Sequence, residues 1–308
     1  MKNVLITGGA GFIGSHLVDW LARSGTDRIT VVDNLRRGKL ENLQVSGVPV
    51  NFVQGDIRDR TLMEDVMRSV TVVYHLAAQS NVLGAVEDLD YSFSTNVTGT
   101  VEVLRAAAKS GVRRVVFTSS REVYGDPERL PVMEDCTPMP KNAYGASKAA
   151  AEMYCRVFSG REIDVAILRL ANVYGPRDFD RVIPIFLGKA LSNLPLTLFG
   201  GNQTIDFVPV QLVIAALIRA GEGLALPGPI NVGSGRAITV MELAKRVVVD
   251  TGSTSEIRIE PPREVEVTRF VASTRQLKEV LGLAPPDDPL ERLADLIEWT
   301  RGPGSSRW

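Results

Sequence analysis

Short apolar runs alternate with longer amphipathic stretches through the first half of the chain. The runs at 3–7, 28–33, 50–56, 71–77 and 113–120 are rich in β-branched residues, as expected of strands that are buried on both faces of a parallel sheet. Patterns of helical period separate these runs. The alternation predicts an α/β fold with a doubly wound parallel sheet, in which ligands bind outside the carboxyl ends of the strands.

A glycine-rich turn follows the first predicted strand and opens the first predicted helix. Gly8, Gly11 and Gly14 permit a tight turn, a close approach to a pyrophosphate and packing of the helix on the sheet, while the helix N-terminus faces the phosphate charge. The glycines can also be counted as GxGxxG from Gly9, so spacing alone leaves the subfamily open. The segment is typical of a Rossmann-like dinucleotide platform.

The end of the second predicted strand bears on the choice of cofactor. Asp33 lies about 20 residues past the glycines, where a carboxylate accepts hydrogen bonds from the hydroxyls of the adenine ribose. This favours NAD over NADP. Arg36 and Arg37 follow closely and leave open the alternative that they hold a 2′-phosphate.

Later strand ends extend the predicted platform. Asp56 is placed to meet the adenine, and Ala77 and Ala78 leave room for the cofactor to pass close to the backbone, although small residues there are also ordinary packing. Asn96 is a polar residue within a helix-like stretch. It is either a cofactor contact or an amide that bends the helix or faces solvent.

The second half mixes helices and strands less regularly. Residues 181–199 predict a helix and a strand, 230–232 a strand, 239–250 a helix and 288–301 a final helix. These segments are too intermixed with the first half to form an independent module. We predict an NAD-binding Rossmann domain over 1–170 and a smaller substrate-binding lobe over 171–308, interleaved with it.

Composition narrows the choice of partners. The 308 residues carry a net charge of -1, which argues against nucleic acid and membrane surfaces and favours a small-molecule substrate. The N-terminus shows no export pattern, so we expect a cytoplasmic protein. Cys136 and Cys155 are expected to be reduced thiols. Two histidines are too few for the usual zinc sites or for Ser-His-Asp catalysis, so we expect no metal.

The candidate chemistry lies in the stretch Tyr144-Gly-Ala-Ser-Lys148, at the start of a predicted helix over 144–159. A spacing of four places the phenol and the ammonium on one helix face. A nearby cation favours the phenolate and makes tyrosine a usable acid/base at neutral pH. The spacing is also common on ordinary helices, so its meaning depends on the surrounding motifs.

Ten segments in register supply that context. They are TGGAGFIGSHL, VDNL, GDIRD, HLAAQ, NVTGT, TSSREVYG, YGASK, RLANVYGPR, DFVPV and INVGSGR. In order and separation they resemble the extended short-chain dehydrogenase/reductase family, which includes nucleotide-sugar epimerases and dehydratases, and the resemblance covers nearly the whole chain.

The resemblance implies an NAD-dependent isomerase of the UDP-glucose 4-epimerase type, acting on a UDP-hexose through a transient 4-keto sugar. It implies that Tyr144 is the acid/base, that Lys148 assists it on the nicotinamide ribose, and that Ser120 hydrogen-bonds the sugar O4. Members of the family commonly pair through two long helices, here near 85–109 and 144–159, so a homodimer is expected.

The predicted site residues fall into three sets. Residues predicted to contact NAD are Gly8, Gly11, Phe12, Ile13, Gly14, Asp33, Asn34, Asp56, Ile57, Leu76, Ala77, Ala78, Asn96, Thr118, Tyr144 and Lys148. Residues that the resemblance places on the nucleotide-sugar are Ser120, Tyr144, Asn172, Arg263 and Glu266, with Asn172 and Arg263 for the diphosphate and Glu266 for the nucleoside ribose. The catalytic set is Tyr144, Lys148, Ser120 and Glu122.

Three departures from the family pattern qualify the prediction. Ile205 stands before Asp206 where the family usually has arginine, and Gln211-Leu212 replaces an acidic pair, so the phosphate grip is expected to be built differently. Arg121 replaces the first residue of the Asp-Glu-Val that is typical of 4,6-dehydratases.

Two alternative functions remain. Glu122 keeps open a nucleotide-sugar dehydratase or a UDP-glucuronate decarboxylase, in which its carboxylate removes the C5 proton, although Arg121 cannot protonate a departing hydroxyl. A catalytically idle NAD-binding sensor is the other alternative.

Overall fold

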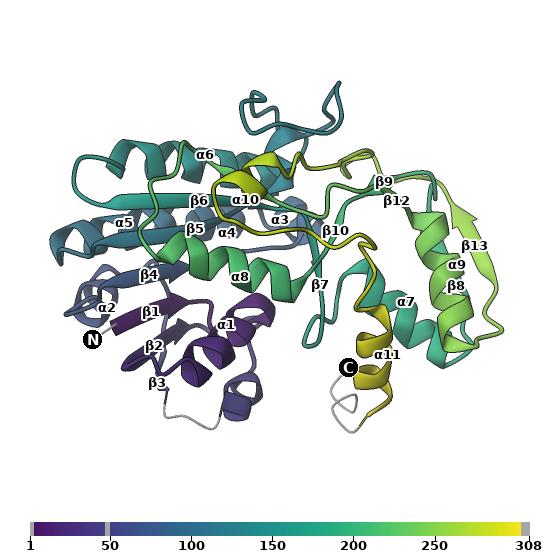
Figure 1. Ribbon diagram of the computed structural model, residues 1–308, viewed down its shortest axis with the longest axis horizontal. Helices are drawn as coiled ribbons and strands as arrows, with labels where there is room; N and C mark the ends of the chain where they lie inside the picture. The colour runs from purple at the N-terminus through teal and green to yellow at the C-terminus, as the bar shows by residue number, and fades with distance from the viewer. Residues whose placement is uncertain (1–2, 47–49, 303–308) are drawn as a thin grey trace.

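The computed structural model describes residues 3–46 and 50–302. A seven-stranded parallel sheet runs in the order β11-β6-β5-β4-β1-β2-β3 (Figure 1). Its strands are β1 (Asn3–Thr7), β2 (Arg28–Asp33), β3 (Asn51–Gln54), β4 (Val72–His75), β5 (Arg114–Ser120), β6 (Asp164–Leu170) and β11 (Ile230–Val232). The predicted doubly wound α/β fold is confirmed, and every strand except β6 lies within a predicted run; β6 was not predicted.

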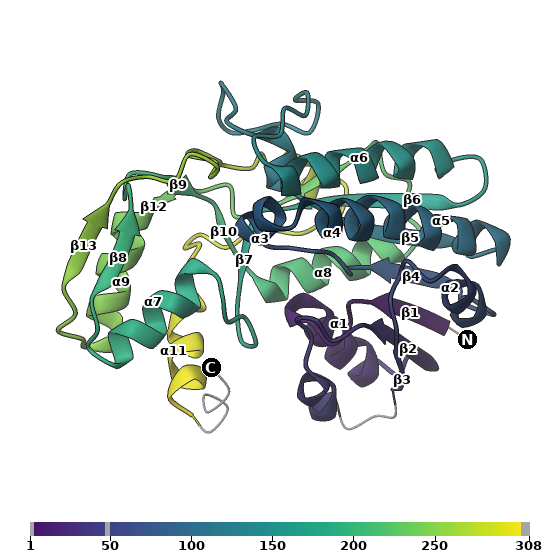
Figure 2. The ribbon, with the colours of Figure 1, turned by 180° about the vertical axis from the view of Figure 1, so that it is seen from behind.

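Helices cover both faces of the sheet, as Figures 1 and 2 show. One apolar cluster joins the sheet to α1 (Phe12–Arg23) and α8 (Val210–Gly221). A second cluster joins the opposite face to α2 (Arg60–Val66), α5 (Thr100–Lys109) and α6 (Ala143–Phe158). Because both faces are buried, the strands read as continuous apolar runs in the sequence.

The predicted long helix near 85–109 is wrong as a single element. It is divided into α3 (Val82–Glu87), α4 (Leu89–Phe93), a π-helical turn η2 (Ser94–Gly99) and α5. The Asp88 side chain caps α4 by accepting a hydrogen bond from the Tyr91 N–H at 3.0 Å. The Thr100 hydroxyl donates to the carbonyl of Asn96 at 2.6 Å. Such side-chain bonds to the backbone compete with a regular helix.

A smaller lobe extends from the carboxyl ends of the strands (Figure 1). Its apolar cluster joins α7 (Val182–Leu191), β8 (Leu196–Phe199), α9 (Val240–Thr251) and α11 (Leu293–Arg301). β8 pairs with β13 (Ile257–Glu260). The final helix begins five residues later than predicted. Both β11 and α8 come from the second half of the chain yet belong to the first domain, so the two parts are interleaved.

Short elements connect the sheet to the lobe. They are η1 (Leu40–Ser46), η3 (Arg121–Tyr124), α10 (Arg275–Glu279), and the paired strands β7 (Asn172–Tyr174) with β10 (Phe207–Pro209) and β9 (Thr204–Ile205) with β12 (Ile238–Thr239). Within 3–46 and 50–302, no helix has the length and apolar character needed to span a membrane.

Candidate active site

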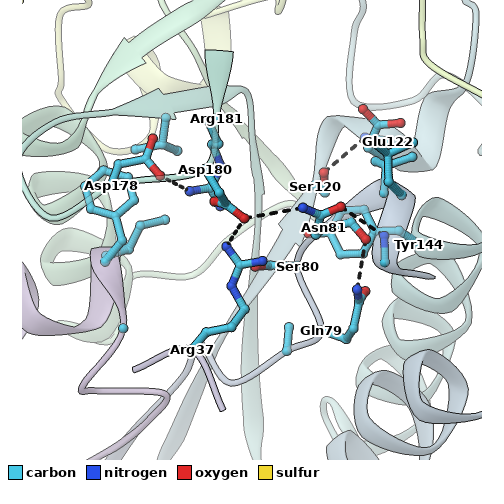
Figure 3. Close-up of a pocket in the computed structure, with 18 of the residues that line it drawn as sticks. Arg37, Gln79, Ser80, Asn81, Ser120, Glu122, Tyr144, Asp178, Asp180 and Arg181 are labelled. Carbon is cyan, nitrogen blue, oxygen red and sulfur yellow. Dashed lines mark hydrogen bonds and ion pairs between the residues drawn. The ribbon is translucent and has the colours of Figure 1, made fainter. Parts of the chain in front are cut away.

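A cleft of about 1130 Å³ lies between the carboxyl ends of the strands and the lobe. One wall comes from the turn after β1, from the ends of β2, β4 and β5, and from α6. The other comes from the segment after β7 and from α7, β8 and β9. Figure 3 shows side chains from both walls facing each other. Nearly all of the predicted site residues line this cleft, Asn96 being the exception.

The glycine turn is built for close approach. Gly8 has φ +73°, and a Cβ added there would lie 2.7 Å from the amide nitrogen of Ala77. A Cβ on Gly14 would lie 2.2 Å from the carbonyl oxygen of Gly8. Helix α1 then starts at Phe12 with no side-chain cap on its first N–H groups. Free N–H groups at a helix N-terminus suit a pyrophosphate, so the residues present fit a dinucleotide.

Asp33 is buried at the end of β2, next to this turn. Its Oδ2 accepts a hydrogen bond from the Ala10 N–H at 3.0 Å, and its Oδ1 accepts one from the Leu35 N–H at 2.9 Å. A carboxylate has about four acceptor positions, so both oxygens keep capacity for ribose hydroxyls. Burial raises the pKa of Asp33, and the two backbone hydrogen bonds oppose that rise.

At the end of the cleft beside β2 and β3, two hydrogen bonds hold a carboxylate in place. Arg58 donates to both oxygens of Asp56 at 2.8 Å, and these bonds lower the pKa of Asp56 to about 2. Asn34 donates to the same carboxylate at 3.2 Å. Asp56, Asn34 and Ile57 all line the cleft, where the sequence predicted a contact with the adenine nucleoside.

Asn96 lies behind the cleft wall. Its amide is buried, accepts a hydrogen bond from the Gln79 N–H at 2.8 Å, and donates to the Gln79 carbonyl at 3.0 Å and to the Ser147 hydroxyl at 2.8 Å. Its side chain therefore neither faces solvent nor reaches the cleft. Asn96 instead fixes the loop after β4, whose residues Ala77, Ala78 and Gln79 do line the cleft.

Tyr144, Lys148 and Ser120 all line the cleft, and the Tyr144 hydroxyl is hydrogen-bonded with Ser120. The side chain of Asn142 caps α6 and accepts a hydrogen bond from the Gly145 N–H at 2.8 Å, which places Tyr144 in the first helical turn. Lys148 is buried and donates from Nζ to the carbonyl of Thr118 at 2.9 Å. Burial lowers the pKa of Lys148 to about 8.

The electrostatics of Tyr144 differ from the sequence argument. Burial raises the pKa of its phenol above the usual value, and the hydrogen bond with Ser120 and the charge of Arg181 only partly oppose this. The expectation that a neighbouring Lys148 lowers this pKa is wrong for the structure as it stands. Two nearby cations do favour the phenolate: Arg181, which comes from the opposite wall of the cleft (Figure 3), and, with a smaller effect, Arg121.

Glu122 lies in the same end of the cleft, with both carboxylate oxygens engaged. Oε1 forms an ion pair with Arg121 at 2.8 Å, and Oε2 accepts a hydrogen bond from Asn142 at 2.7 Å. The backbone N–H of Glu122 donates to the Ser120 hydroxyl at 3.2 Å. Glu122 is thus a fixed carboxylate that helps to orient the start of α6.

Three of the predicted substrate residues, Asn172, Arg263 and Glu266, line the lobe half of the cleft. Arg263 pairs with Glu266 at 3.1 Å, and its guanidinium lies 3.7 Å from the centre of the Phe199 ring. Asn172 has a buried Oδ1 without a hydrogen-bond partner in the described part of the chain. Ile205 also lines the cleft and packs on the apolar cluster of the lobe.

Several lining residues lie outside the three predicted sets. Arg181 is paired with the buried Asp178 at 2.6 Å, whereas Arg177 is paired with Asp19 and does not line the cleft. Lys189 lines the lobe wall, and Asp180 bridges the two walls (Figure 3). These residues belong to one loop and one helix face, and no local motif marks them as parts of a site.

A fully buried polar network supports the floor of the cleft. Arg169 donates to both oxygens of Glu152 at 2.9 and 2.7 Å, and it also donates to the Tyr124 hydroxyl at 2.8 Å. Ser119, next to Ser120, donates to Glu152 at 2.5 Å. Glu152 lies one helical turn beyond Lys148, so the network fixes the end of β5 against α6.

Comparison with known proteins agrees with this geometry. The model of the NAD dependent epimerase/dehydratase family matches residues 4–233. The chain is 36% identical over 307 residues to a UDP-glucose 4-epimerase of Mycolicibacterium smegmatis, covering 96% of this chain and 98% of the relative.

Two solved structures are similar along the whole chain. A UDP-glucose 4-epimerase of Thermotoga maritima with UDP-glucose has a TM-score of 0.92 and 35% identity, covering 97% of this chain and 99% of that one. A UDP-glucose 4-epimerase of Thermus thermophilus in complex with NAD has a TM-score of 0.90 and 36% identity, covering 98% of this chain and 100% of that one.

Proposed function

The chain belongs to the NAD-dependent epimerase/dehydratase family, and within it we propose that the protein is a 4-epimerase of a UDP-hexose of the UDP-glucose/UDP-galactose type. The observation that carries the proposal is the meeting of Tyr144, Ser120 and Lys148 between a dinucleotide platform and a lobe that can hold a nucleotide. Similarity to UDP-glucose 4-epimerases along nearly the whole chain supports it.

The residues divide the chemistry as follows. When bound, NAD supplies the acceptance and return of a hydride at the sugar C4. The Tyr144 oxygen takes the O4 proton as C4 becomes a ketone, and gives it back when C4 is reduced on its other face. Ser120 hydrogen-bonds the same oxygen of the sugar. Lys148 has ammonium protons beyond its bond to Thr118, and these can hold the nicotinamide ribose.

Burial of the phenol raises its pKa, so the charged form of Tyr144 needs cations near it. Arg181 supplies one from the lobe wall, and Arg121 supplies another from the segment after β5. Positive charge on both sides of the phenol favours the phenolate in the closed cleft. The proposed acid/base therefore depends on both walls of the cleft and not on α6 alone.

The geometry of Glu122 weighs against the dehydratase and decarboxylase alternatives. A base that removes the C5 proton must turn a carboxylate oxygen toward the sugar, yet the contacts with Arg121 and Asn142 hold the Glu122 carboxylate in one orientation. The presence of Tyr144, Ser120 and Lys148 together weighs against an idle sensor. Epimerisation needs Tyr144, Ser120 and Lys148, and it needs Glu122 only to orient the start of α6.

The test is a mass-resolved assay of the purified protein with UDP-glucose, UDP-galactose and UDP-glucuronate. We expect interconversion of the first two without a change in mass. A product lighter by one water or one carbon dioxide would instead support the dehydratase or the decarboxylase. Absence of any turnover, with bound NAD never reduced by a sugar nucleotide, would support the sensor.

We also propose a homodimer, which an exposed apolar surface on α3, α4 and α6 supports. The two short helices lie beside α6 (Figure 2), and their exposed side chains include Leu89 and Phe93, with Met153 and Val157 on α6. We expect light scattering to report a dimer and Phe93→Glu to weaken it, whereas Val249→Glu, on the lobe, leaves it unchanged. A monomeric wild-type protein at micromolar concentration would contradict this.

A cytoplasmic location is proposed as well. Its support is that Cys136 and Cys155 are free thiols, which suits a reducing compartment. Cell fractionation tests it, and recovery of the protein outside the cytoplasm would contradict it.

A further inference from the structure

Arg37 is placed where a dinucleotide-binding fold can recognise a 2′-phosphate. The backbone after β2 curls back, so that a Cβ on Gly38 would lie 2.8 Å from both carboxylate oxygens of Asp33. Arg37 therefore originates directly beside the carboxylate that faces the adenine ribose, and it lines the cleft. An arginine near this carboxylate is the usual means by which such folds accommodate NADP.

Arg37 is already occupied, by a residue from the other wall. Asp180, 143 positions later in the chain, accepts a hydrogen bond from its Nη2 at 2.5 Å. The same carboxylate oxygen accepts one from Asn81 Nδ2 at 3.3 Å. Figure 3 shows Asp180 lying between Arg37 and Asn81. The guanidinium thus meets a carboxylate in place of a phosphate.

The loop that carries Asp180 is held at several points. Arg177 adopts φ +69° and pairs with Asp19 at 2.6 Å, with both side chains largely buried. His16 Nε2 lies 2.9 Å from the carbonyl oxygen of Pro176. The Phe179 ring lies 5.5 Å from the guanidinium of Arg37. These contacts hold Asp180 against Arg37.

Arg36, the neighbour of Arg37, also has partners. The Arg36 guanidinium stacks 3.6 Å from the centre of the Tyr91 ring, and it pairs with Asp88 at 3.7 Å. Stacking on Tyr91 directs Arg36 toward the adenine end and away from Asp33. Of the two arginines that follow β2, Arg37 is the one whose charge is cancelled by the loop after β7.

We propose that Asp180 is a second determinant of cofactor choice, which masks Arg37 so that the protein discriminates against a 2′-phosphate. Asp33 repels that phosphate by its own charge, and Asp180 removes the cation that would otherwise compensate. The proposal concerns the cofactor half of the cleft and does not depend on which sugar is the substrate.

The test compares the dissociation constants of NAD and NADP by calorimetry on the full chain after removal of bound cofactor. For Asp180→Ala we expect the preference for NAD over NADP to fall about 10-fold or more, since a charge-assisted hydrogen bond from a released Arg37 contributes about that factor. Asp180→Asn, nearly the same in shape, should behave alike. Asp287→Ala removes a carboxylate that pairs with Arg236 at 2.9 Å outside the cleft, and it should leave the preference unchanged.

A double variant identifies the source of the gain. In Asp180→Ala with Arg37→Ala the NADP affinity should fall back, whereas Arg37→Ala alone should change the preference little, because its charge is already cancelled. Wild-type preference in both Asp180 variants would overturn the proposal. So would an equal gain with and without Arg37, or a parallel loss of NAD and NADP binding, which would mean that the bridge is purely structural. None of these outcomes bears on the sugar specificity, which the assay with sugar nucleotides tests separately.

Discussion

Replacing Arg169 with methionine leaves the Glu152 carboxylate without its guanidinium in a part of the molecule that solvent does not reach. Both side chains have 0% exposure, and the two bonds between them measure 2.9 and 2.7 Å. Removing one partner of a buried ion pair costs about 3 to 5 kcal/mol, and the Glu152 charge would keep only the longer 3.7 Å contact with Arg156, which is 45% exposed. The Tyr124 hydroxyl and the Glu134 carbonyl also lose a donor.

The expected loss is large enough to measure by thermal unfolding. For chains somewhat shorter than this one, 1 kcal/mol shifts Tm by about 2 to 4 °C, so Arg169→Met should lower Tm by roughly 6 to 20 °C. Calorimetry at one fixed scan rate compares the variants. Arg246→Met is the matched control, since Arg246 pairs with Asp250 at 2.6 Å but is 46% exposed, and exposed pairs contribute about 0 to 1 kcal/mol.

A double variant distinguishes the cost of the buried Glu152 charge from the cost of lost packing around Arg169. Adding Glu152→Gln to Arg169→Met removes the orphaned charge, so the double variant should recover part of the lost Tm. Turnover at 25 °C should fall in Arg169→Met, because Ser119 donates to Glu152 and lies next to Ser120. An Arg169→Met protein that melts within about 3 °C of wild type, no lower than the Arg246→Met control, would refute the reasoning.

Three further predictions address the site. Tyr144→Phe should keep fold and NAD binding but lose at least about 100-fold to 10,000-fold in turnover; a rate above a tenth of wild type would remove Tyr144 from the mechanism. Arg263→Ala should weaken UDP binding about 10-fold to 150-fold, with partial rescue by Ile205→Arg; unchanged affinity in calorimetry would contradict it. The pKa of Lys148 is lowered from 10.5 to about 8 by burial, so the folded state binds its proton less well than the unfolded state does. Without NAD, Lys148→Met should therefore be more stable than wild type below pH 8, and the difference should shrink between pH 8 and 10.5; a pH-independent difference in denaturant unfolding would refute this.

The parts of the fold that could be predicted are those with local signals. Strands buried on both faces are mostly apolar, so β1, β4 and the centre of β5 can be recognised as apolar runs in the sequence. The glycine turn and Asp33 are separated by one helix, and their geometry follows from one βαβ unit. The division of the helix near 85–109 could not be predicted. The residues around Asp88 and Thr100 favour a helix, and the interruption comes from their side-chain hydrogen bonds to the Tyr91 N–H and the Asn96 carbonyl.

The electrostatics of the site could not be predicted from the sequence. The spacing of Tyr144 and Lys148 was read correctly as one helix face, but a pKa depends on burial and on charges from distant segments. At Tyr144 the effect of burial, which raises the pKa, exceeds the effects that lower it. The charge that lowers this pKa most belongs to Arg181. The bridge from Asp180 to Arg37 joins residues 143 positions apart through a loop in which Arg177 adopts a left-handed conformation. Neither fact has a signature in the local sequence.

The phosphate grip expected to change with Ile205 now has a physical description. Ile205 forms part of the cleft wall and of the apolar lobe cluster, so it supplies no charge. Eight acidic and seven basic residues line the cleft, so the cleft has no excess of fixed positive charge.

Arg181 is tied to Asp178 and Arg263 to Glu266. Lys189 lines the same wall without an ion-pair partner among the described residues. A diphosphate on this wall can therefore gain a full cation from Lys189, or by separating Arg181 from Asp178 or Arg263 from Glu266. Separating Arg263 from Glu266 would also free the Glu266 carboxylate to accept hydrogen bonds from ribose hydroxyls. The two roles that the family resemblance assigns to Arg263 and Glu266 would then be consequences of one exchange, in which a salt bridge within the lobe is replaced by two contacts with the nucleotide.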